Sequence, residues 1–293
     1  MNPQGASTSA GQCDAQAEGQ SKFEKRKKKI EGRMALVDHV LVVLSGKGGV
    51  GKSTVAVNVA GELARQGEKV GLLDADMHGP STPHMLDLEG PPVAADGQVM
   101  RPVEHPSGLK VMSIGFLLRQ RDDAVVWRGP MKMNLLGQFL ADVEWGELDY
   151  LVVDLPPGTG DEPLSVCQLI PELTGGIIVT TPQEVALSDV RKCVNFCHDI
   201  GLPVLGVVEN MSGYVCPHCG ERSDIFGSGG GEQMAGQMDV PFLGRVPVDP
   251  RMVEACDAGR MFVEEFPESD ATVALNEAVE MIVESAERDN NSE

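Results

Sequence analysis

A glycine-rich segment near the start of the chain constrains the fold more than any other feature. It reads Ser45-Gly46-Lys47-Gly48-Gly49-Val50-Gly51-Lys52-Ser53-Thr54 and matches the pattern G-x-x-x-x-G-K-[ST]. The apolar residues 39–44 before it are typical of a buried strand, and residues 55–65 after it have helical spacing. Glycines let backbone N–H groups turn toward phosphate oxygens at the positive end of a helix. The segment therefore predicts a phosphate-binding loop, or P-loop, between a strand and a helix.

The residues of this loop have separate predicted tasks. Lys52 would neutralise the β- and γ-phosphates of a nucleotide, and the Ser53 hydroxyl would complete the ligand shell of Mg²⁺. Lys47 adds a second lysine directly after the first glycine. The predicted nucleotide contacts are Gly46, Lys47, Gly48, Gly49, Val50, Gly51, Lys52, Ser53, Thr54 and, from a later strand, Asn210. The Asn210 amide would read an adenine edge, and a turn-forming asparagine is the alternative.

Strand patterns and helical patterns alternate along the rest of the chain. Strands are predicted near residues 70–73, 150–153, 176–180, 204–208 and 242–246, and helices near 130–143, 162–171, 184–200, 229–238 and 270–287. Such alternation predicts an α/β fold, a three-layer sandwich with a mainly parallel sheet. Asp96-Gly97, within residues 93–118, predicts a hairpin beside the sheet.

The length of 293 residues favours one domain with two tails. Residues 1–35 are polar and include the basic run Lys25–Lys29, which predicts a disordered or partly helical arm. Residues 36–287 would form the P-loop domain, with an insertion near 211–225. Residues 288–293 would be a frayed tail.

Charge and hydropathy exclude several classes of partner. The 44 acidic residues outnumber the 24 basic ones, for a net charge of −20, which opposes binding to a phosphate backbone. No apolar run approaches the roughly 18 residues that span a membrane, and the polar N-terminus is unlike a signal peptide. Seven cysteines, an odd number, do not suggest a disulfide framework. We therefore expect a cytoplasmic protein with no nucleic-acid or membrane partner.

Two acidic loops follow predicted strands, at the sheet edge where such folds bind ligands. Asp74 and Asp76 begin one loop, and Asp154 begins the other. Asp74 and Asp154 are predicted Mg²⁺ ligands, and Asp76 would orient or deprotonate the attacking water. Gly158 and Gly160 would let the second loop reach a γ-phosphate. The alternative for both loops is a plain turn after a strand.

A C-x-x-C pair, Cys216 and Cys219, lies between Gly213 and Gly220. Its spacing suits two thiolates on one metal ion or cluster, and a four-ligand site would then need a second copy of the chain. An iron–sulfur cluster, a zinc ion and a redox-active dithiol all remain open at this point. His218 is interpreted as a loop residue rather than a ligand.

Taken together, these segments resemble the Mrp/ApbC type of iron–sulfur cluster carrier, within the MinD-like, deviant-Walker P-loop ATPases of the SIMIBI class. The resemblance covers residues from about 38 to about 250 and is carried by Gly46–Ser53, Asp74–Ser81, Trp127-Arg128-Gly129-Pro130, Asp154–Asp161 and Cys216-Pro217-His218-Cys219. It implies a P-loop NTPase fold with ATP hydrolysis, in which Lys47, Lys52 and Asp76 are catalytic.

The same resemblance implies a homodimer with ATP near the interface, where Lys47 often contacts the partner's phosphate. A labile 4Fe-4S cluster would be bridged by Cys216 and Cys219 of both subunits and passed to apo-proteins. Eukaryotic members of the family carry an N-terminal four-cysteine motif for a second cluster. Here the arm holds only Cys13, so no stable N-terminal cluster is expected.

Two other functions compete with the carrier. A MinD/ParA-like positioning ATPase would need a basic membrane-binding C-terminal helix or a basic DNA-binding surface, but Arg288 is the only base in residues 276–293. The second rival is a zinc-binding regulatory protein in which nucleotide acts only as a switch.

Overall fold

The computed structural model describes residues 23–90, 94–95, 99–117, 129–216 and 218–290. Its strands are β1 (Val37–Leu44), β2 (Val70–Asp74), β3 (Ala94–Ala95), β4 (Val99–Met100), β5 (Val103–Glu104), β6 (Lys110–Ser113), β7 (Leu148–Asp154), β8 (Gly175–Thr180), β9 (Val204–Val215), β10 (Arg222–Ser223) and β11 (Phe242–Val248). Its helices are α2 (Lys52–Arg65), α3 (Thr82–Met85), α4 (Gly129–Asp142), α5 (Asp161–Leu169), α6 (Glu184–Asp199), α7 (Gly230–Gln237), α8 (Pro250–Asp257), α9 (Phe262–Glu265) and α10 (Asp270–Asn290). A further helix covers residues 23–34, and a 3₁₀ turn, η1, covers Ile114–Leu117.

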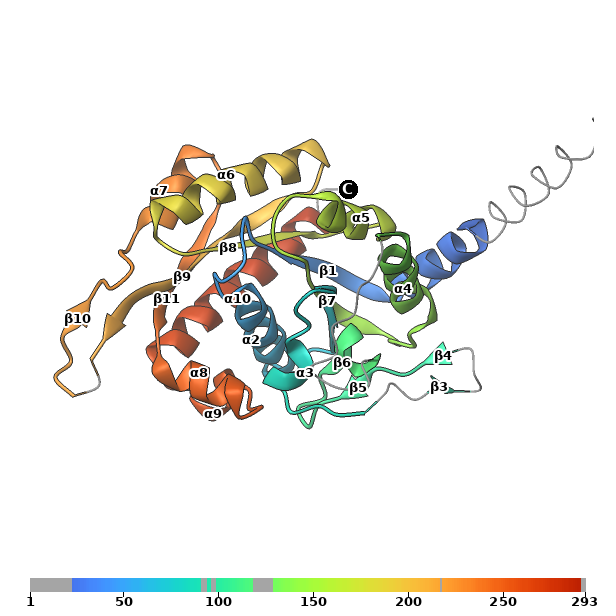
Figure 1. Ribbon diagram of the computed structural model, residues 1–293, viewed down its shortest axis with the longest axis horizontal. Helices are drawn as coiled ribbons and strands as arrows, with labels where there is room; N and C mark the ends of the chain where they lie inside the picture. The colour runs from blue at the N-terminus through green and yellow to red at the C-terminus, as the bar shows by residue number, and fades with distance from the viewer. Residues whose placement is uncertain (1–22, 91–93, 96–98, 118–128, 217, 291–293) are drawn as a thin grey trace, which may run out of the picture.

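A nine-stranded, mainly parallel sheet runs through the middle of the molecule (Figure 1). Its order is β10-β9-β8-β1-β7-β2-β6-β5, and β11 also pairs with β9. Only the short strands β5 and β10 pair antiparallel within it. The central position of β1 places the P-loop at the middle of the sheet's carboxyl edge.

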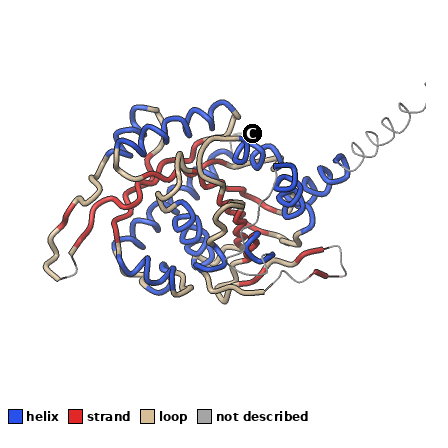
Figure 2. The backbone as a smooth tube through the Cα atoms, in the orientation of Figure 1, coloured by secondary structure: helices blue, strands red, loops and turns tan. Residues whose placement is uncertain are grey.

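The strands are buried on both faces, and successive side chains alternate between two hydrophobic cores. In β1, Leu41 and Val43 enter the core under α2, α8, α9 and α10. Val40, Val42 and Leu44 enter the core under α4, α5, α6, α7 and the 23–34 helix. Figure 2 shows these helices lying on the two sides of the strands. The three-layer α/β sandwich is therefore confirmed.

Strand β9 and the segment of α8 and α9 differ from the sequence-based expectation, whereas the expected hairpin agrees with it as far as the structure describes it. Strand β9 was expected over 204–208 but continues to Val215 and forms, with β10, a ribbon that extends from the molecule (Figure 1). Helices α8 and α9 have no predicted counterpart. Strands β3 and β4 pair antiparallel as the expected hairpin requires, while its turn at 96–98 lies outside the described residues.

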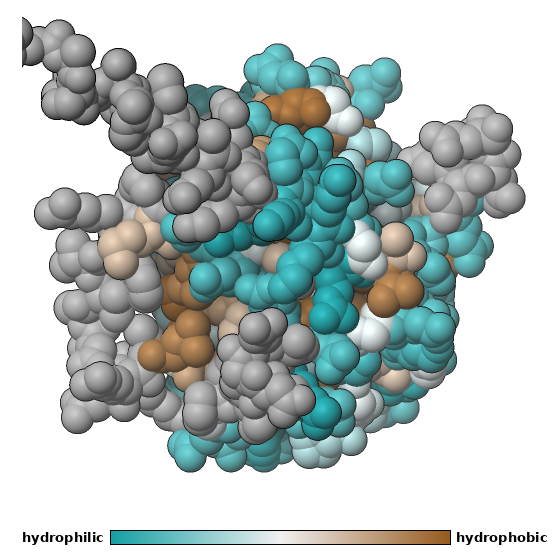
Figure 3. All heavy atoms as spheres, turned by 90° about the vertical axis from the view of Figure 1, so that its right-hand side faces the viewer, coloured by the Kyte–Doolittle hydropathy of each residue, from teal (hydrophilic) through white to brown (hydrophobic). Residues whose placement is uncertain are grey.

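The basic run Lys25–Lys29 lies on the 23–34 helix, which packs against the domain. Ile30 and Met34, one helical turn apart, are buried in the second core. Arg26 donates to Asn134 at 2.6 Å, and Lys29 pairs with Asp142 at 2.8 Å, so the helix is fixed to α4. The surface described on this side of the molecule is mostly hydrophilic with separate apolar patches (Figure 3).

Helix α10 is the last described element, and several predicted residues lie outside the described ranges. Helix α10 continues to Asn290, past the boundary expected at 287. Cys13 and residues 291–293 lie outside the described part, as do Trp127 and Arg128. Among the helices that the structure does describe, none combines the length and the apolar character needed to cross a membrane.

Candidate nucleotide site and cysteine ribbon

The P-loop joins β1 to α2 in a conformation that requires glycine. Gly49 and Gly51 have φ values of 81° and 82°, in the left-handed region that other residues avoid. A Cβ atom on Gly51 would also lie 2.2 Å from Nδ2 of Asn210. Gly51 caps α2 without a side-chain hydrogen bond, and the first turn holds no acidic residue. The positive end of α2 is therefore open to an anion.

A buried ion pair lies directly behind this loop. Lys52 Nζ is 2.5 Å from Oδ1 of Asp154, and the two side chains are 6% and 1% exposed. Lys52 Nζ also donates to Ser53 Oγ at 3.3 Å. Burial raises the pKa of the Asp154 carboxyl, although Lys52 and Ser53 act in the opposite direction. Oδ2 of Asp154 is buried without a hydrogen-bond partner among the described residues.

Asp74 lies beside Asp154, because the two residues are paired in register at the ends of β2 and β7. Its carboxylate accepts hydrogen bonds from the backbone of Asp76 and Thr82 and from the Ser113 hydroxyl, at 3.1, 3.3 and 3.0 Å. Burial and then the charge of Asp154 raise the pKa of Asp74 to about 7. The predicted Mg²⁺ ligands Asp74, Asp154 and Ser53 are thus brought to one edge, and Asp74 already anchors its own loop.

The loops after β2 and β7 face each other across a cavity of about 470 Å³. Its lining includes Asp76, Gly79, Pro156 and Gly160. Asp76 Oδ1 accepts from the backbone N–H groups of His78 and Gly79 at 3.1 and 3.2 Å, so it also forms a local turn. The loop of Gly158 reaches the P-loop, where its N–H donates to the Ser45 carbonyl at 2.8 Å. The two acidic loops therefore border the same site.

Other P-loop side chains differ in exposure. Lys47 is partly exposed and, among the described residues, no side chain pairs with it; its carbonyl accepts from the Ser45 hydroxyl at 3.0 Å. Gly48 and Gly49 are exposed, whereas Val50 is buried. Gly46 packs so closely on Asp189 of α6 that a Cβ would lie 2.5 Å from its backbone. Thr54 is partly exposed at the first turn of α2.

A charged cluster that sequence reasoning missed connects these loops to α4. Lys132, nearly buried on α4, lies 2.5 Å from Oε1 of Glu162 and 2.7 Å from Nε2 of His78. Burial would raise the pKa of Glu162, but the bonds from Lys132 and His78 outweigh it and lower that pKa. His78 belongs to one acidic loop and Glu162 to the helix after the other. The only sequence signal was Lys132, a lone cation in the helical pattern of residues 130–143.

Asn210 contacts the P-loop from β9. Its Nδ2 donates to the Val50 carbonyl at 2.9 Å, and both residues are buried. The amide therefore lies at the nucleotide edge, and its role in reading adenine stays a prediction.

Cys216 and Cys219 lie where the β9–β10 ribbon turns. The turn is closed by the N–H of Gly220 donating to the Cys216 carbonyl at 2.8 Å and that of Cys216 donating to Glu221 at 3.0 Å. Cys216 is partly exposed and Cys219 is exposed. Backbone N–H groups of His218 and Cys219 lower the pKa of the Cys216 thiol, which favours the metal-binding thiolate. Within the described residues, no three His, Cys, Asp or Glu side chains are placed to hold a metal ion.

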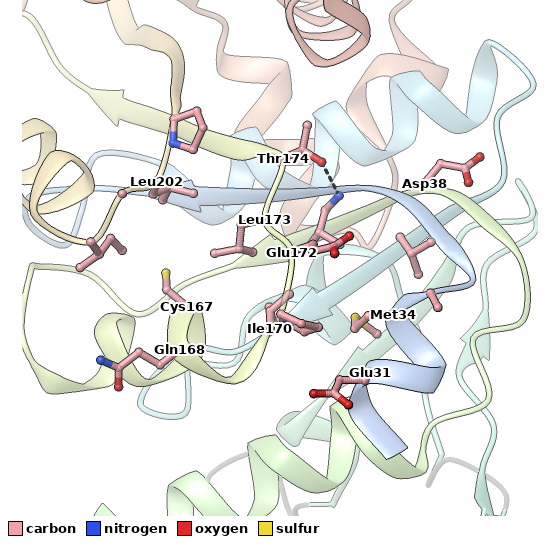
Figure 4. A pocket seen from close by; sticks show the side chains of 17 residues that line it. Glu31, Met34, Asp38, Cys167, Gln168, Ile170, Glu172, Leu173, Thr174 and Leu202 are labelled. Atoms are coloured by element: carbon pink, nitrogen blue, oxygen red, sulfur yellow. Dashed lines mark hydrogen bonds between the residues drawn. The ribbon is translucent and has the colours of Figure 1, made fainter. Parts of the chain in front are cut away.

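A second cavity, of about 900 Å³, lies at the opposite end of β1 from the P-loop (Figure 4). Apolar side chains such as Met34 and Leu202 line it together with the carboxylates of Glu31, Asp38 and Glu172. Thr174 closes one wall by accepting from the Val40 backbone at 3.0 Å. The carboxylates that line this second cavity would repel phosphate, and the cavity lies apart from the P-loop. We therefore do not assign nucleotide to it.

A family model described as "ParA: NUBPL iron-transfer P-loop NTPase" matches residues 36–283. The chain belongs to this family. It is 51% identical over 248 residues to the rat (Rattus norvegicus) protein named cytosolic Fe-S cluster assembly factor NUBP2, covering 83% of this chain and 92% of that one. The relative of that name from Trichoplax adhaerens is 50% identical over 253 residues, 85% of this chain and 96% of its own.

Among solved structures, a nucleotide-binding protein from Archaeoglobus fulgidus in complex with ADP is 41% identical, with a TM-score of 0.73 over 84% of this chain and 95% of that chain. Membership of this P-loop NTPase family agrees with the geometry of the loop around Lys52.

Proposed function

We propose that this protein is an ATP-binding and ATP-hydrolysing carrier that holds a labile 4Fe-4S cluster as cargo between two copies of the chain. The cluster would be passed to apo-proteins in the cytoplasm. The names of the relatives, which are cytosolic Fe-S cluster assembly factors, support this cargo and this location. The observation that carries the proposal is the pair of thiols of Cys216, partly exposed, and Cys219, exposed, on a ribbon that begins beside the P-loop.

The nucleotide edge fits a triphosphate with Mg²⁺. The free, buried Oδ2 of Asp154 and the Ser53 hydroxyl are hard oxygen donors of the kind that Mg²⁺ prefers. When bound, the ion would neutralise charge on the β- and γ-phosphates. Asp74 would contribute only after releasing some of its present hydrogen bonds, so we assign it chiefly to holding loop 74–81.

The remaining roles belong to this chain's own polar groups. Lys52, now paired with Asp154, would turn to the phosphates, because a phosphate offers a stronger accumulation of negative charge. Asp76 would hold the attacking water at the cavity between the loops. Lys47 is partly exposed and free of side-chain partners in the described part, so it can contact the phosphates of a second copy.

The cysteine turn supplies half of a four-thiolate site. A 4Fe-4S cluster takes four thiolates, and one chain offers two at this turn. A two-fold axis through the ribbon ends would bring together Cys216 and Cys219 of both chains, as an isologous contact requires. The homodimer is therefore part of the proposal. The exposure of the thiols would let an acceptor protein approach the cluster.

The test is anaerobic reconstitution with iron and sulfide, followed by visible absorbance and iron and zinc analysis. The wild-type protein and Cys256→Ser should gain a broad absorption and bind iron, because Cys256 lies on α8, away from the turn. Cys216→Ser and Cys219→Ser should gain neither, while unfolding near the wild-type temperature. Tight zinc without a cluster in the wild type would favour the regulatory rival and contradict the carrier.

A further inference from the structure

Glu209 is a buried carboxylate at the base of the cysteine ribbon, outside the predicted nucleotide and cluster contacts. It lies in β9 and is fully buried. Its Oε1 accepts from the Ser212 hydroxyl at 2.5 Å and from the Gly229 N–H at 2.8 Å, and Oε2 accepts from the Gly231 N–H. A buried charge is tolerated only with such partners, so the arrangement is costly to disturb.

These bonds hold both ends of the ribbon. Ser212 belongs to the outgoing strand, whereas Gly229 and Gly231 form the return into α7. The Ser212 hydroxyl also lies 3.2 Å from that of Ser228, which ties the two ends to each other. A Cβ on Gly231 would come within 2.9 Å of Oε2 of Glu209, so the close approach depends on glycine. One carboxylate thus fixes the segment that carries Cys216 and Cys219.

The next residue along the strand touches the nucleotide edge. Asn210 donates to the Val50 carbonyl of the P-loop, at 2.9 Å. Met211 follows with a φ of 57°, a left-handed conformation that is unfavourable for this residue type. Its terminal methyl is also close to Gly51, 3.7 Å from where a Cβ would lie. A strained residue therefore joins the P-loop contact to the ribbon.

We propose that Glu209 is a positioning residue that links the occupancy of the P-loop to the placement of the cysteine turn. This inference rests on the proposed nucleotide and cluster sites and names the route between them. Asn210, Met211 and Ser212 are consecutive in β9, so a shift of Asn210 moves the strand on which Glu209 acts. The turn that begins at Cys216 lies six residues beyond Asn210, at the far end of the ribbon, so a small rotation at Asn210 is magnified there (Figure 1).

The coupling needs no cluster, so the thiols themselves report it. In metal-free protein, the rates at which iodoacetamide alkylates Cys216 and Cys219 are measured with and without Mg²⁺ and a non-hydrolysable ATP analogue. Peptide mass spectrometry assigns each rate. We expect the analogue to change at least one rate by about fivefold or more in the wild type, the size of a typical coupling between two sites.

Two variants and a matched control complete the test. Ser212→Ala removes the hydroxyl that Glu209 holds on the outgoing strand, and Glu209→Gln weakens every contact of the carboxylate. Both should reduce the response to less than about twofold, a loss of most of the coupling. Ser223→Ala, at an exposed position of β10, should keep the wild-type response.

Nucleotide affinity and unfolding temperature are measured on the same samples. Ser212→Ala should bind the analogue within about threefold of the wild type, because Ser212 lies outside the nucleotide site. A wild-type response retained by Ser212→Ala, no response in the wild type, or loss of nucleotide binding in Ser212→Ala would each overturn the inference. None of these results changes whether the wild type takes up a cluster on Cys216 during anaerobic reconstitution. Reconstitution therefore tests the proposed carrier function separately from this inference.

Discussion

The nucleotide edge and the cysteine ribbon are built on opposite principles. At the nucleotide edge, Lys52, Asp74 and Asp154 are buried. Lys52, at the start of α2, pairs with Asp154, and Asp74 and Asp154 end the neighbouring strands β2 and β7. At the end of the ribbon, Cys216 and Cys219 are at least partly exposed, and β10 contributes a strand of only two residues. The first site is nearly complete in one chain, whereas the second would provide two of the four thiolates that the proposed cluster needs.

This difference suggests a division of labour between the two regions. A buried charge cluster has low tolerance for change, because each removed partner leaves an uncompensated charge. A pair of exposed thiols can gain and lose a ligand without unfolding the domain, as a carrier requires. Substitutions at the nucleotide edge should therefore affect hydrolysis and stability, and substitutions at the ribbon should affect cargo alone.

Lys52→Ala should have the largest effect. It removes the cation that we assign to the phosphates, so we expect ATP hydrolysis to fall about 10³-fold or more, measured as phosphate release. Cluster reconstitution should persist if the two regions are separable. The control is Lys192→Ala, which removes an exposed lysine that pairs with Asp189 on the surface. This variant should hydrolyse ATP at the wild-type rate. If Lys52→Ala hydrolysed ATP within twofold of the control rate, the assignment of Lys52 to the phosphates would be contradicted.

Lys47→Ala should slow hydrolysis by about 10²-fold, with a smaller effect on nucleotide affinity, because a lysine from the second copy would act mainly in the transition state. The rate per chain of the wild type should rise with protein concentration as dimers form. The hydrolysis rate per chain and the nucleotide affinity are measured for the wild type and Lys47→Ala over one series of protein concentrations. A large loss of affinity with an unchanged rate constant would place Lys47 in ground-state binding within its own chain.

Lys132→Met should lower the free energy of unfolding by about 2 kcal/mol, since it leaves Glu162 without its nearly buried cation. Urea denaturation measures this change. The matched control is Lys69→Met, whose pair with Glu147 is exposed on both sides, and it should cost less than about 1 kcal/mol. Equal effects of the two variants would show that the cluster between the loops contributes no more than a surface pair.

Asp74→Asn should change how stability depends on pH. The folded pKa of Asp74 is raised from 3.8 to about 7, so the folded state binds its proton more tightly than the unfolded state. This group's stabilisation is therefore present at low pH and is lost as pH rises toward 7. Between pH 5 and pH 8 the free energy of unfolding of the variant should rise by about 2.6 kcal/mol relative to that of the wild type.

Urea denaturation of nucleotide-free protein at the two pH values measures the gain. Asp239→Asn, at an exposed turn, should gain little. Parallel pH profiles for the wild type and Asp74→Asn would contradict the assignment of a raised pKa.

Much of the nucleotide edge was predictable from the sequence because its determinants are local. Strands β1 and β7 are buried on both faces, so they appear as uninterrupted apolar runs, and Asp154 directly ends one of them. Glycines at positive φ marked the P-loop. The spacing of Ile30 and Met34, directly after the basic run, could also have indicated that the helix containing this run packs on the domain.

The tertiary contacts were not predictable in this way. The roles of Glu209, Lys132 and Ser212 depend on hydrogen bonds to residues that the fold brings next to them. The sequence around each residue does not indicate these partners. Strand β9 was underestimated because polar residues from Glu209 onward break its apolar run, although Glu209 itself is buried. The C-x-x-C spacing predicted a metal or redox role for the cysteine pair, and the structure adds that the ribbon carrying it begins beside the P-loop.

Native mass spectrometry of the reconstituted protein under anaerobic conditions tests the central claim most directly. The proposal predicts one species of two chains with one 4Fe-4S cluster, which disappears when Cys216 and Cys219 are both replaced by serine. A single chain that carries a whole cluster, or a dimer that retains its cluster without these thiols, would contradict it.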